Sequence, residues 1–327
     1  MKKIIAAVIG GVLLIAALFI ALKPASFDEQ LQKSLAGLDR YHMTANMEML
    51  SGEDVKSYDI MLCWQKKNDT EFYRVALLDK SLNQEQIILR NADGVYVLTP
   101  SLNQAFKFKG DWPNNSPKPY LYQSMMGVLN GKYSAKKEKD GWFVTADVDY
   151  PNSPQLVKQE MKFDKEFKPV WVKVYNDNGT VEVKIEFKET DFKPEFSATH
   201  FDVNENLKAN QTTVNVSADL PLYPVYVFDA RLVNSSVASI GKETRHILEF
   251  SGEKSFTIVQ VQKKRNAEPV VQQVSGELVD AIDVFGAFDG TRLTVYDNNV
   301  EYTIYSQDLS PEEMLQVVTS MQVAVMK

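Results

Sequence analysis

The sequence predicts a mainly β (α+β) protein: a large curled antiparallel sheet of half-barrel form with covering helices, followed by a smaller α+β C-terminal domain. Many short segments alternate apolar and polar residues, which is the pattern of half-buried strands. Turn sequences such as Asp140-Gly141 separate these segments. Helical periodicity occurs in only a few places. Such a sheet has one wet face and one apolar face, and the apolar face must be covered.

The strands of the large sheet are expected in the first two thirds of the chain. They are Met43–Met49, Tyr58–Gln65, Glu71–Leu78, Ile87–Leu89, Val95–Leu98, Ala105–Lys109, Trp142–Tyr150, Leu156–Asp164, Pro169–Tyr175 and Val181–Lys188. A helix is predicted over Phe27–Leu38, because Ser26 and Glu29 have capping-box spacing. A second helix is predicted over Pro119–Leu129. Two short helices leave two alternatives for so wide a sheet, a tightly packed core or an apolar groove.

The composition predicts a boundary near residues 209–218, a polar stretch of small residues that is typical of a linker. Residues 26–208 would form the curved-sheet domain and residues 219–327 the smaller domain. Strands are expected there at Pro224–Leu232, His246–Phe250, Ser255–Gln262, Thr291–Tyr296 and Glu301–Ser306. A helix should begin at Ser310, where Ser310-Pro-Glu-Glu313 combines a capping box with proline at the first helical position.

Residues 1–25 are predicted to be a transmembrane anchor or a signal segment. Ile4–Leu22 is continuously apolar, and its length fits a spanning helix better than a signal peptide core. Lys2 and Lys3 favour an N-terminus inside the cell. We therefore expect a single-pass protein of the cell membrane with its C-terminal part extracytoplasmic, or a secreted protein if the segment is cleaved.

Charge and composition exclude several classes of function. After Lys2, Lys3 and Lys23 are set aside, 33 basic residues face 43 acidic ones, and this balance argues against binding to nucleic acid. The three histidines are isolated, and Cys63 is the only cysteine. We find no zinc motif, phosphate-binding loop or nucleophile elbow. The sequence therefore predicts no catalytic residue, no metal and no cofactor, and a non-catalytic protein.

The stretch from Gln86 to Asn115, QIILRNADGVYVLTPSLNQAFKFKGDWPNN, is similar to the central hairpins of Gram-positive sporulation and germination proteins of the YdcC and GerS type. These resemble the lipoprotein-carrier superfamily (LolA/LolB-like, outer-membrane lipoprotein-sorting proteins). The similarity continues more weakly from about Phe27 to about Leu207. It implies a LolA-like half-barrel with a groove for acyl chains and no catalytic motif. Family members are often lipoproteins, but no cysteine lies near Ala21–Ser26.

The candidate site is an apolar lining on the concave face of the sheet and under the second helix. Methionine is flexible and polarisable, which suits a surface for varied ligands, although the same spacing is typical of ordinary core. The residues are Met43, Met47, Met49, Met61, Phe106, Phe108, Tyr120, Leu121, Tyr122, Met125, Met126, Val128 and Leu129. Arg90 follows an apolar strand and is a candidate polar contact, or else a charge at a strand end.

Two functions follow as hypotheses. The first is an extracytoplasmic, membrane-anchored protein that binds the acyl chains of a lipid or lipoprotein. The alternative is a protein-interaction module of the cell envelope, either a sporulation or germination partner of a cell-wall enzyme or an envelope-signalling regulator, in which a sheet edge could bind by strand addition. An interior filled by the protein's own side chains would favour the alternative.

Overall fold

The computed structural model describes residues 26–51, 54–109, 118–209, 219–241, 243–297 and 299–322. Its contacts divide the chain into two compact units, residues 1–38 and 39–327. The first unit holds helix α2 (Phe27–Leu35), where Ser26 and Glu29 form the predicted capping box. The helix ends three residues earlier than expected, and Gly37 follows it with a φ of 83°. The predicted anchor at residues 1–25 lies outside the described residues, as does nearly all of the predicted linker.

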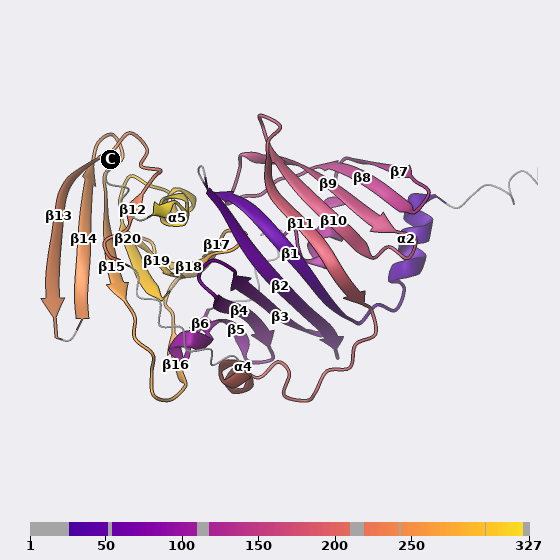
Figure 1. Ribbon diagram of the computed structural model, residues 1–327, viewed down its shortest axis with the longest axis horizontal. Helices are drawn as coiled ribbons and strands as arrows, with labels where there is room; N and C mark the ends of the chain where they lie inside the picture. The colour runs from indigo at the N-terminus through magenta and orange to yellow at the C-terminus, as the bar shows by residue number, and fades with distance from the viewer. Residues whose placement is uncertain are drawn as a thin grey trace, which may run out of the picture. The chain divides into compact units, whose positions relative to one another are not determined.

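The second unit is built on a sheet of 12 strands (Figure 1). In spatial order the strands are β16 (Val270–Gln273), β6 (Gln104–Phe108), β5 (Gly94–Thr99), β4 (Gln84–Asn91), β3 (Thr70–Asp79), β2 (Asp54–Lys67), β1 (Arg40–Ser51), β11 (Val181–Asp191), β10 (Pro169–Asn176), β9 (Leu156–Asp164), β8 (Gly141–Asp147) and β7 (Tyr133–Lys137). Neighbours pair antiparallel except β16 and β6, which are parallel. The sheet is therefore mixed, because a strand from the C-terminal third joins its edge.

Both faces of this sheet bury apolar residues. On the inner face, one row crosses six strands through Met43, Leu62, Val75, Ile88, Val97 and Phe106, all at most 2% exposed. On the outer face, α4 (Val203–Ala209) covers strands β5 and β6, with Phe201 and Leu207 packed in a cluster that includes Cys63 and Leu89. The sequence pattern did not predict α4, which rests on strands far from it in the chain.

The smaller sheet has seven strands and helix α5 (Pro311–Thr319). Its order is β13 (Arg231–Ile240), β14 (Glu243–Ser251), β15 (Phe256–Gln262), β20 (Val300–Tyr305), β19 (Arg292–Asp297), β18 (Phe285–Phe288) and β17 (Glu277–Asp280). Met314, Val317 and Val318 of α5 belong to the buried core of this sheet. The capping box of Ser310 and Glu313 is present as predicted.

The predicted fold class is confirmed, since a large sheet with covering helices is followed by a smaller α+β part. One expected strand, Pro224–Leu232, is wrong in its bounds. A two-residue strand β12 (Tyr223–Pro224) pairs instead with β21 (Met321–Gln322), and the long strand β13 begins only at Arg231. Among the described residues, no helix is both long enough and apolar enough to span a membrane.

Candidate functional site

The predicted lining on the strands is buried but filled. Met43, Met47 and Phe106 have no exposed surface, and Phe108 is 4% exposed. The ring of Phe106 stacks on Tyr296 of β19, with ring centroids 3.5 Å apart and planes 16° apart. A side chain from the smaller sheet therefore occupies the space that an acyl chain would need above β6.

The segment before and within α3 (Tyr122–Val128) closes the same face. Tyr120, Leu121, Tyr122 and Met125 are at most 3% exposed, whereas Met126, Val128 and Leu129 are half-buried. The Tyr120 hydroxyl donates to the carbonyl oxygen of Ile282 at 2.8 Å, and the Tyr122 hydroxyl donates to that of Phe167 at 2.9 Å. These hydrogen bonds satisfy the two buried hydroxyls with partners from the protein itself.

One predicted lining residue, Met61, lies on the other face of the sheet. Thr44 is opposite Met61 in the sheet register, so Met61 projects from the face opposite Met43 and is 42% exposed. Its place in the concave lining is therefore wrong, because the alternation of β2 turns it outward. Met49 lies at the end of β1, in the groove described next. Arg90 is on the inner face beside Val95 and is paired with Glu71 at 3.4 Å.

An open groove of about 540 Å³ lies where the ends of β1, β2, β9 and β11 meet the smaller sheet. This volume is within the range of small-ligand sites. The lining combines apolar side chains with amides and hydroxyls. It consists of Met49, Leu50, Lys56, Ser153, Pro154, Gln155, Leu156, Glu182, Val183, Tyr226, Ala281, Ile282, Asp283, Gln316, Thr319 and Ser320. No motif marks this set, because its members come from seven separate stretches of the chain.

A charged network forms one wall of the groove. The Lys56 ammonium lies 3.7 Å from Asp283, and the Tyr58 hydroxyl donates to the same carboxylate at 2.8 Å. Burial lowers the pKa of Lys56, but the carboxylates of Asp283, Asp297 and Asp79 outweigh it and raise the pKa overall. Lys56 is therefore cationic at neutral pH. With Glu182 included, the groove carries one more negative than positive charge.

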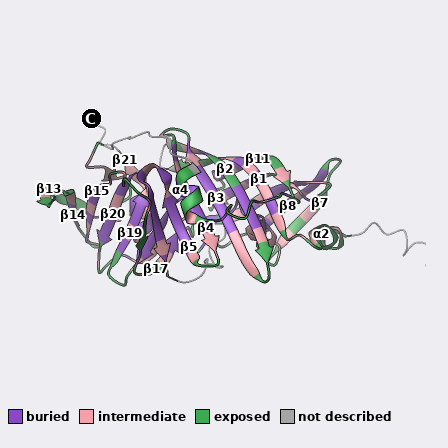
Figure 2. Cartoon of the chain, turned by 90° about the horizontal axis from the view of Figure 1, so that it is seen from below, coloured by how far each residue is buried: buried purple, intermediate pink, exposed green. Residues whose placement is uncertain are grey.

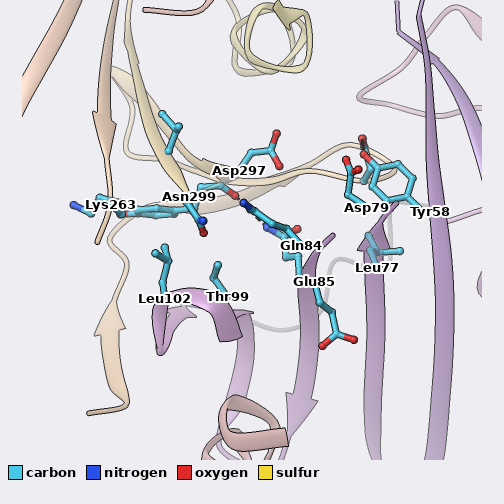
Figure 3. Close-up of a pocket in the computed structure, with 14 residues that line it drawn as sticks. Tyr58, Leu77, Asp79, Gln84, Glu85, Thr99, Leu102, Lys263, Asp297 and Asn299 are labelled. Atoms are coloured by element: carbon cyan, nitrogen blue, oxygen red, sulfur yellow. Dashed lines mark hydrogen bonds between the residues drawn. The ribbon is translucent and has the colours of Figure 1, made fainter. Parts of the chain in front are cut away.

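Beside this network is a polar seam between β4, β5 and the turn from β19 to β20 (Figure 3). Asp79, Gln84, Asp297 and Asn299 point into it. Its volume is about 30 Å³, which is enough for a few waters but not for an organic ligand. The seam is a narrow polar contact between the two sheets.

A buried ion pair joins the same parts of the chain. Lys118 and Asp280 have side chains only 1% and 2% exposed, and they form an ion pair. The Lys118 ammonium also donates to the carbonyl oxygen of Ala281 and lies 4.7 Å from the centre of the Phe285 ring. Because an unpaired buried charge is costly, this pair holds the loop after β17 in place at the groove.

The described residues offer little for catalysis. Burial raises the pKa of Cys63 to about 12, against a smaller opposing effect of Arg74, so the thiol stays protonated at neutral pH and is a poor nucleophile. Burial, together with the charge of Arg74, lowers the pKa of His200 to about 4. Within the described part of the chain, no three metal-ligating side chains are grouped as a metal site would require.

No protein-family model matches the chain. Among solved structures, two are weakly similar to the chain. One is the MucA/MucB complex of Pseudomonas aeruginosa, at 11% identity over 91% of this chain and 98% of that one, with a TM-score of 0.33. The other is a putative outer membrane lipoprotein-sorting protein domain from Vibrio parahaemolyticus, at 10% identity over 55% and 97%, with a TM-score of 0.32.

The sequence relationship is stronger. The chain is 33% identical over 335 residues to sporulation protein YdcC of Bacillus subtilis (strain 168), and the match covers 95% of this chain and 96% of that protein. Nearly the whole length is shared, so the match is not confined to the hairpins that suggested the family. The chain belongs to the family of sporulation protein YdcC.

Proposed function

We propose that this protein is a membrane-anchored, extracytoplasmic and non-catalytic protein of the cell envelope that acts in sporulation. It binds a partner protein in the open groove between the ends of the two sheets. The observation that carries the proposal is a contrast. The inner face of the larger sheet is filled by the protein's own side chains, whereas the groove at its end is open. The role in sporulation rests on the relative, and the anchor rests on the apolar run Ile4–Leu22.

The lining of the groove suits an extended peptide. Met49, Leu156 and Ile282 offer apolar contacts for side chains, and Gln155 and Gln316 offer amides for backbone groups. A peptide that enters a groove must keep its N–H and C=O groups hydrogen-bonded, which purely apolar walls would not allow. The net negative charge of the lining favours a partner segment that carries a basic residue.

The test is made in Bacillus subtilis cells that lack YdcC and carry the full-length chain. Gln155 is exposed and lines the groove, so Gln155→Trp fills the groove without disturbing the core. The matched control is Lys139→Trp, an exposed position in the turn between β7 and β8. We expect Gln155→Trp to lose complementation of spore formation and to lose crosslinks to its envelope partner, whereas Lys139→Trp keeps both. Full complementation by Gln155→Trp would contradict the assignment of the groove.

A second candidate function is acyl-chain binding under α3. It is favoured by the continuous inner row that includes Met43 and by the buried Met125 of α3, a helix of only seven residues without a side-chain N-cap hydrogen bond. Cells that make the full-length chain are fed a photoreactive fatty acid and irradiated. Crosslinks at residues 43–47 or 122–125 would support a carrier. Crosslinks confined to residues 1–25 would show contact of the N-terminal segment with the membrane and would contradict acyl-chain binding under α3.

A further inference from the structure

The smaller sheet ends in a long bare strand, β13 (Arg231–Ile240). It forms one edge of that sheet and is hydrogen-bonded to β14 on one side, and the described part of the chain supplies no partner strand on the other. Nine of its ten residues are exposed, and the tenth is half-buried (Figure 2). The backbone groups along its outer side are therefore available for pairing.

The residue types of β13 do not oppose pairing with another strand. Arg231 at its start is its only charged residue, and the rest, LVNSSVASI, is small, polar or apolar. Val233 is 63% exposed, Val237 61% and Ile240 56%. Edge strands of soluble proteins are usually kept apart by lysines, proline or short length. None of these devices is present between Leu232 and Ile240.

The other sheet edges are short or charged. Strand β7 has five residues and ends in Lys136 and Lys137. Strands β16 and β17 have four residues each, and Asp280 of β17 is held by the buried Lys118. Helix α5 packs near β12, β17 and β19, at the opposite side of the sheet from β13. Among the described edge strands, a long edge without charged residues is thus specific to β13.

We propose that β13 is a docking strand that binds an extended, uncharged and β-branched segment of a partner protein, which adds to the smaller sheet as an eighth strand. This inference rests on the proposed partner-binding function and names a second contact surface for it. The charge of β13 selects the occupant. A lysine or glutamate in the added strand would face serine, alanine or valine and would gain no counter-ion from β13 beyond Arg231. Valine and threonine would pack against Val233 and Val237.

The test uses the full-length chain in lipid nanodiscs and a defined probe. The probe is a fluorescein-labelled peptide of ten alternating threonine and valine residues with capped ends. The control peptide replaces each threonine by lysine. Binding is followed by fluorescence anisotropy, and amide hydrogen exchange over residues 231–240 reports where the peptide binds. We expect binding of the uncharged peptide alone, with slower exchange confined to β13.

Two variants locate the contact. Val237→Lys places a charge in the middle of β13 at an exposed position, and we expect it to weaken binding of the peptide at least tenfold. The matched control is Val271→Lys on β16, the edge of the other sheet, where Val271 is 46% exposed. The control should bind as the native protein does. Unchanged thermal unfolding midpoints would show that neither variant disturbs the fold.

Four results would overturn the proposal. Equal binding by the native protein and Val237→Lys would exclude β13. Equal binding of both peptides would exclude selection by lack of charge. A concentration-dependent dimer that Val237→Lys abolishes would assign the strand to a second copy of the chain. In cells, the two variants are compared by their crosslinks to the partner. If Gln155→Trp loses these crosslinks and Val237→Lys keeps them, β13 is excluded as a docking strand and the proposed function remains intact. If both variants retain crosslinks and spore formation, the proposed function itself fails.

Discussion

In the described part of the chain, strands β7 and β13 are both outermost strands of their sheets, but they differ in length and charge. β7 is five residues long with two exposed lysines at its end, and β13 is ten residues long with no charge after Arg231. The same contrast separates the two sheets. The larger one hides its inner face under α3 and the loop after β17. The smaller one leaves a strand bare. Covering the inner face of the larger sheet stabilises the fold. An unpaired edge such as β13 promotes association and lowers solubility, so we expect it to be kept for a function.

The largest effect should come from the buried ion pair that closes the larger sheet. Lys118→Ala leaves the Asp280 carboxylate buried without a counter-ion, and we expect it to lower the free energy of unfolding by about 3–5 kcal/mol. Lys132→Ala removes the partner of Asp147, a pair with side chains 91% and 70% exposed, and should cost at most about 1 kcal/mol. Urea unfolding of the full-length chain measures both. Equal losses would show that burial at Lys118 is unimportant.

The two faces of the larger sheet should differ next. Met43→Ala opens a cavity at a fully buried position, and we expect it to cost about 2–5 kcal/mol. Met61→Ala changes a side chain that is 42% exposed on the other face and should stay within about 0.5–1 kcal/mol. Urea unfolding curves of the two variants measure the difference. A small loss for Met43→Ala would indicate a loosely filled interior and would revive acyl-chain binding.

Local patterns predicted much of the fold. Alternation at Ala105–Lys109 and the capping boxes at Ser26 and Ser310 depend on neighbours in the sequence, and the structure confirms them. Met61 was misplaced because Tyr58–Gln65 has apolar residues at successive positions, among them Cys63, and so does not show which face is inner. Strand β13 was missed because a sequence rich in serine has no clear alternation.

The candidate site could not be predicted in the same way. Lys56, Gln155 and Gln316 come together only when the ends of the two sheets meet, and no residue type or spacing marks any of them. Asp283 is similar, since its role depends on Tyr58 and Lys56, which are more than 200 positions earlier in the chain. A surface that is set by long-range packing leaves no local signal.

A smaller change in the free energy of unfolding should come from His200, in the segment before α4 that packs on the outer face of the larger sheet. His200 stacks on Phe196 with ring centroids 4.6 Å apart, and burial, followed by the charge of Arg74, lowers its pKa to about 4. Because this folded-state pKa lies below the ordinary 6.5, protonation favours the unfolded chain. Stability is therefore full above pH 6.5 and is lost as the pH falls toward 4.

Between pH 7 and pH 5 we expect His200 to account for a loss of about 1 kcal/mol, a figure roughly halved because the ring is only partly buried. His200→Gln removes the titrating group. Unfolding is measured for both proteins at pH 7 and pH 5, and the difference between them isolates His200 from the carboxylates. An equal loss in His200→Gln would show that this histidine does not contribute.

The smallest change in stability should come from replacing Lys136, an exposed lysine on the edge strand β7. Lys136 is exposed, so Lys136→Val should alter the free energy of unfolding by less than about 0.5 kcal/mol. Its effect should be on association instead, because the edge then offers unpaired backbone groups beside an apolar side chain. Sedimentation velocity over a concentration series measures this, with Val237→Lys as the opposite change on β13. If Lys136→Val stays monomeric, the lysine is not what prevents association through β7. The lack of charge on β13 would then be weaker support for a docking strand.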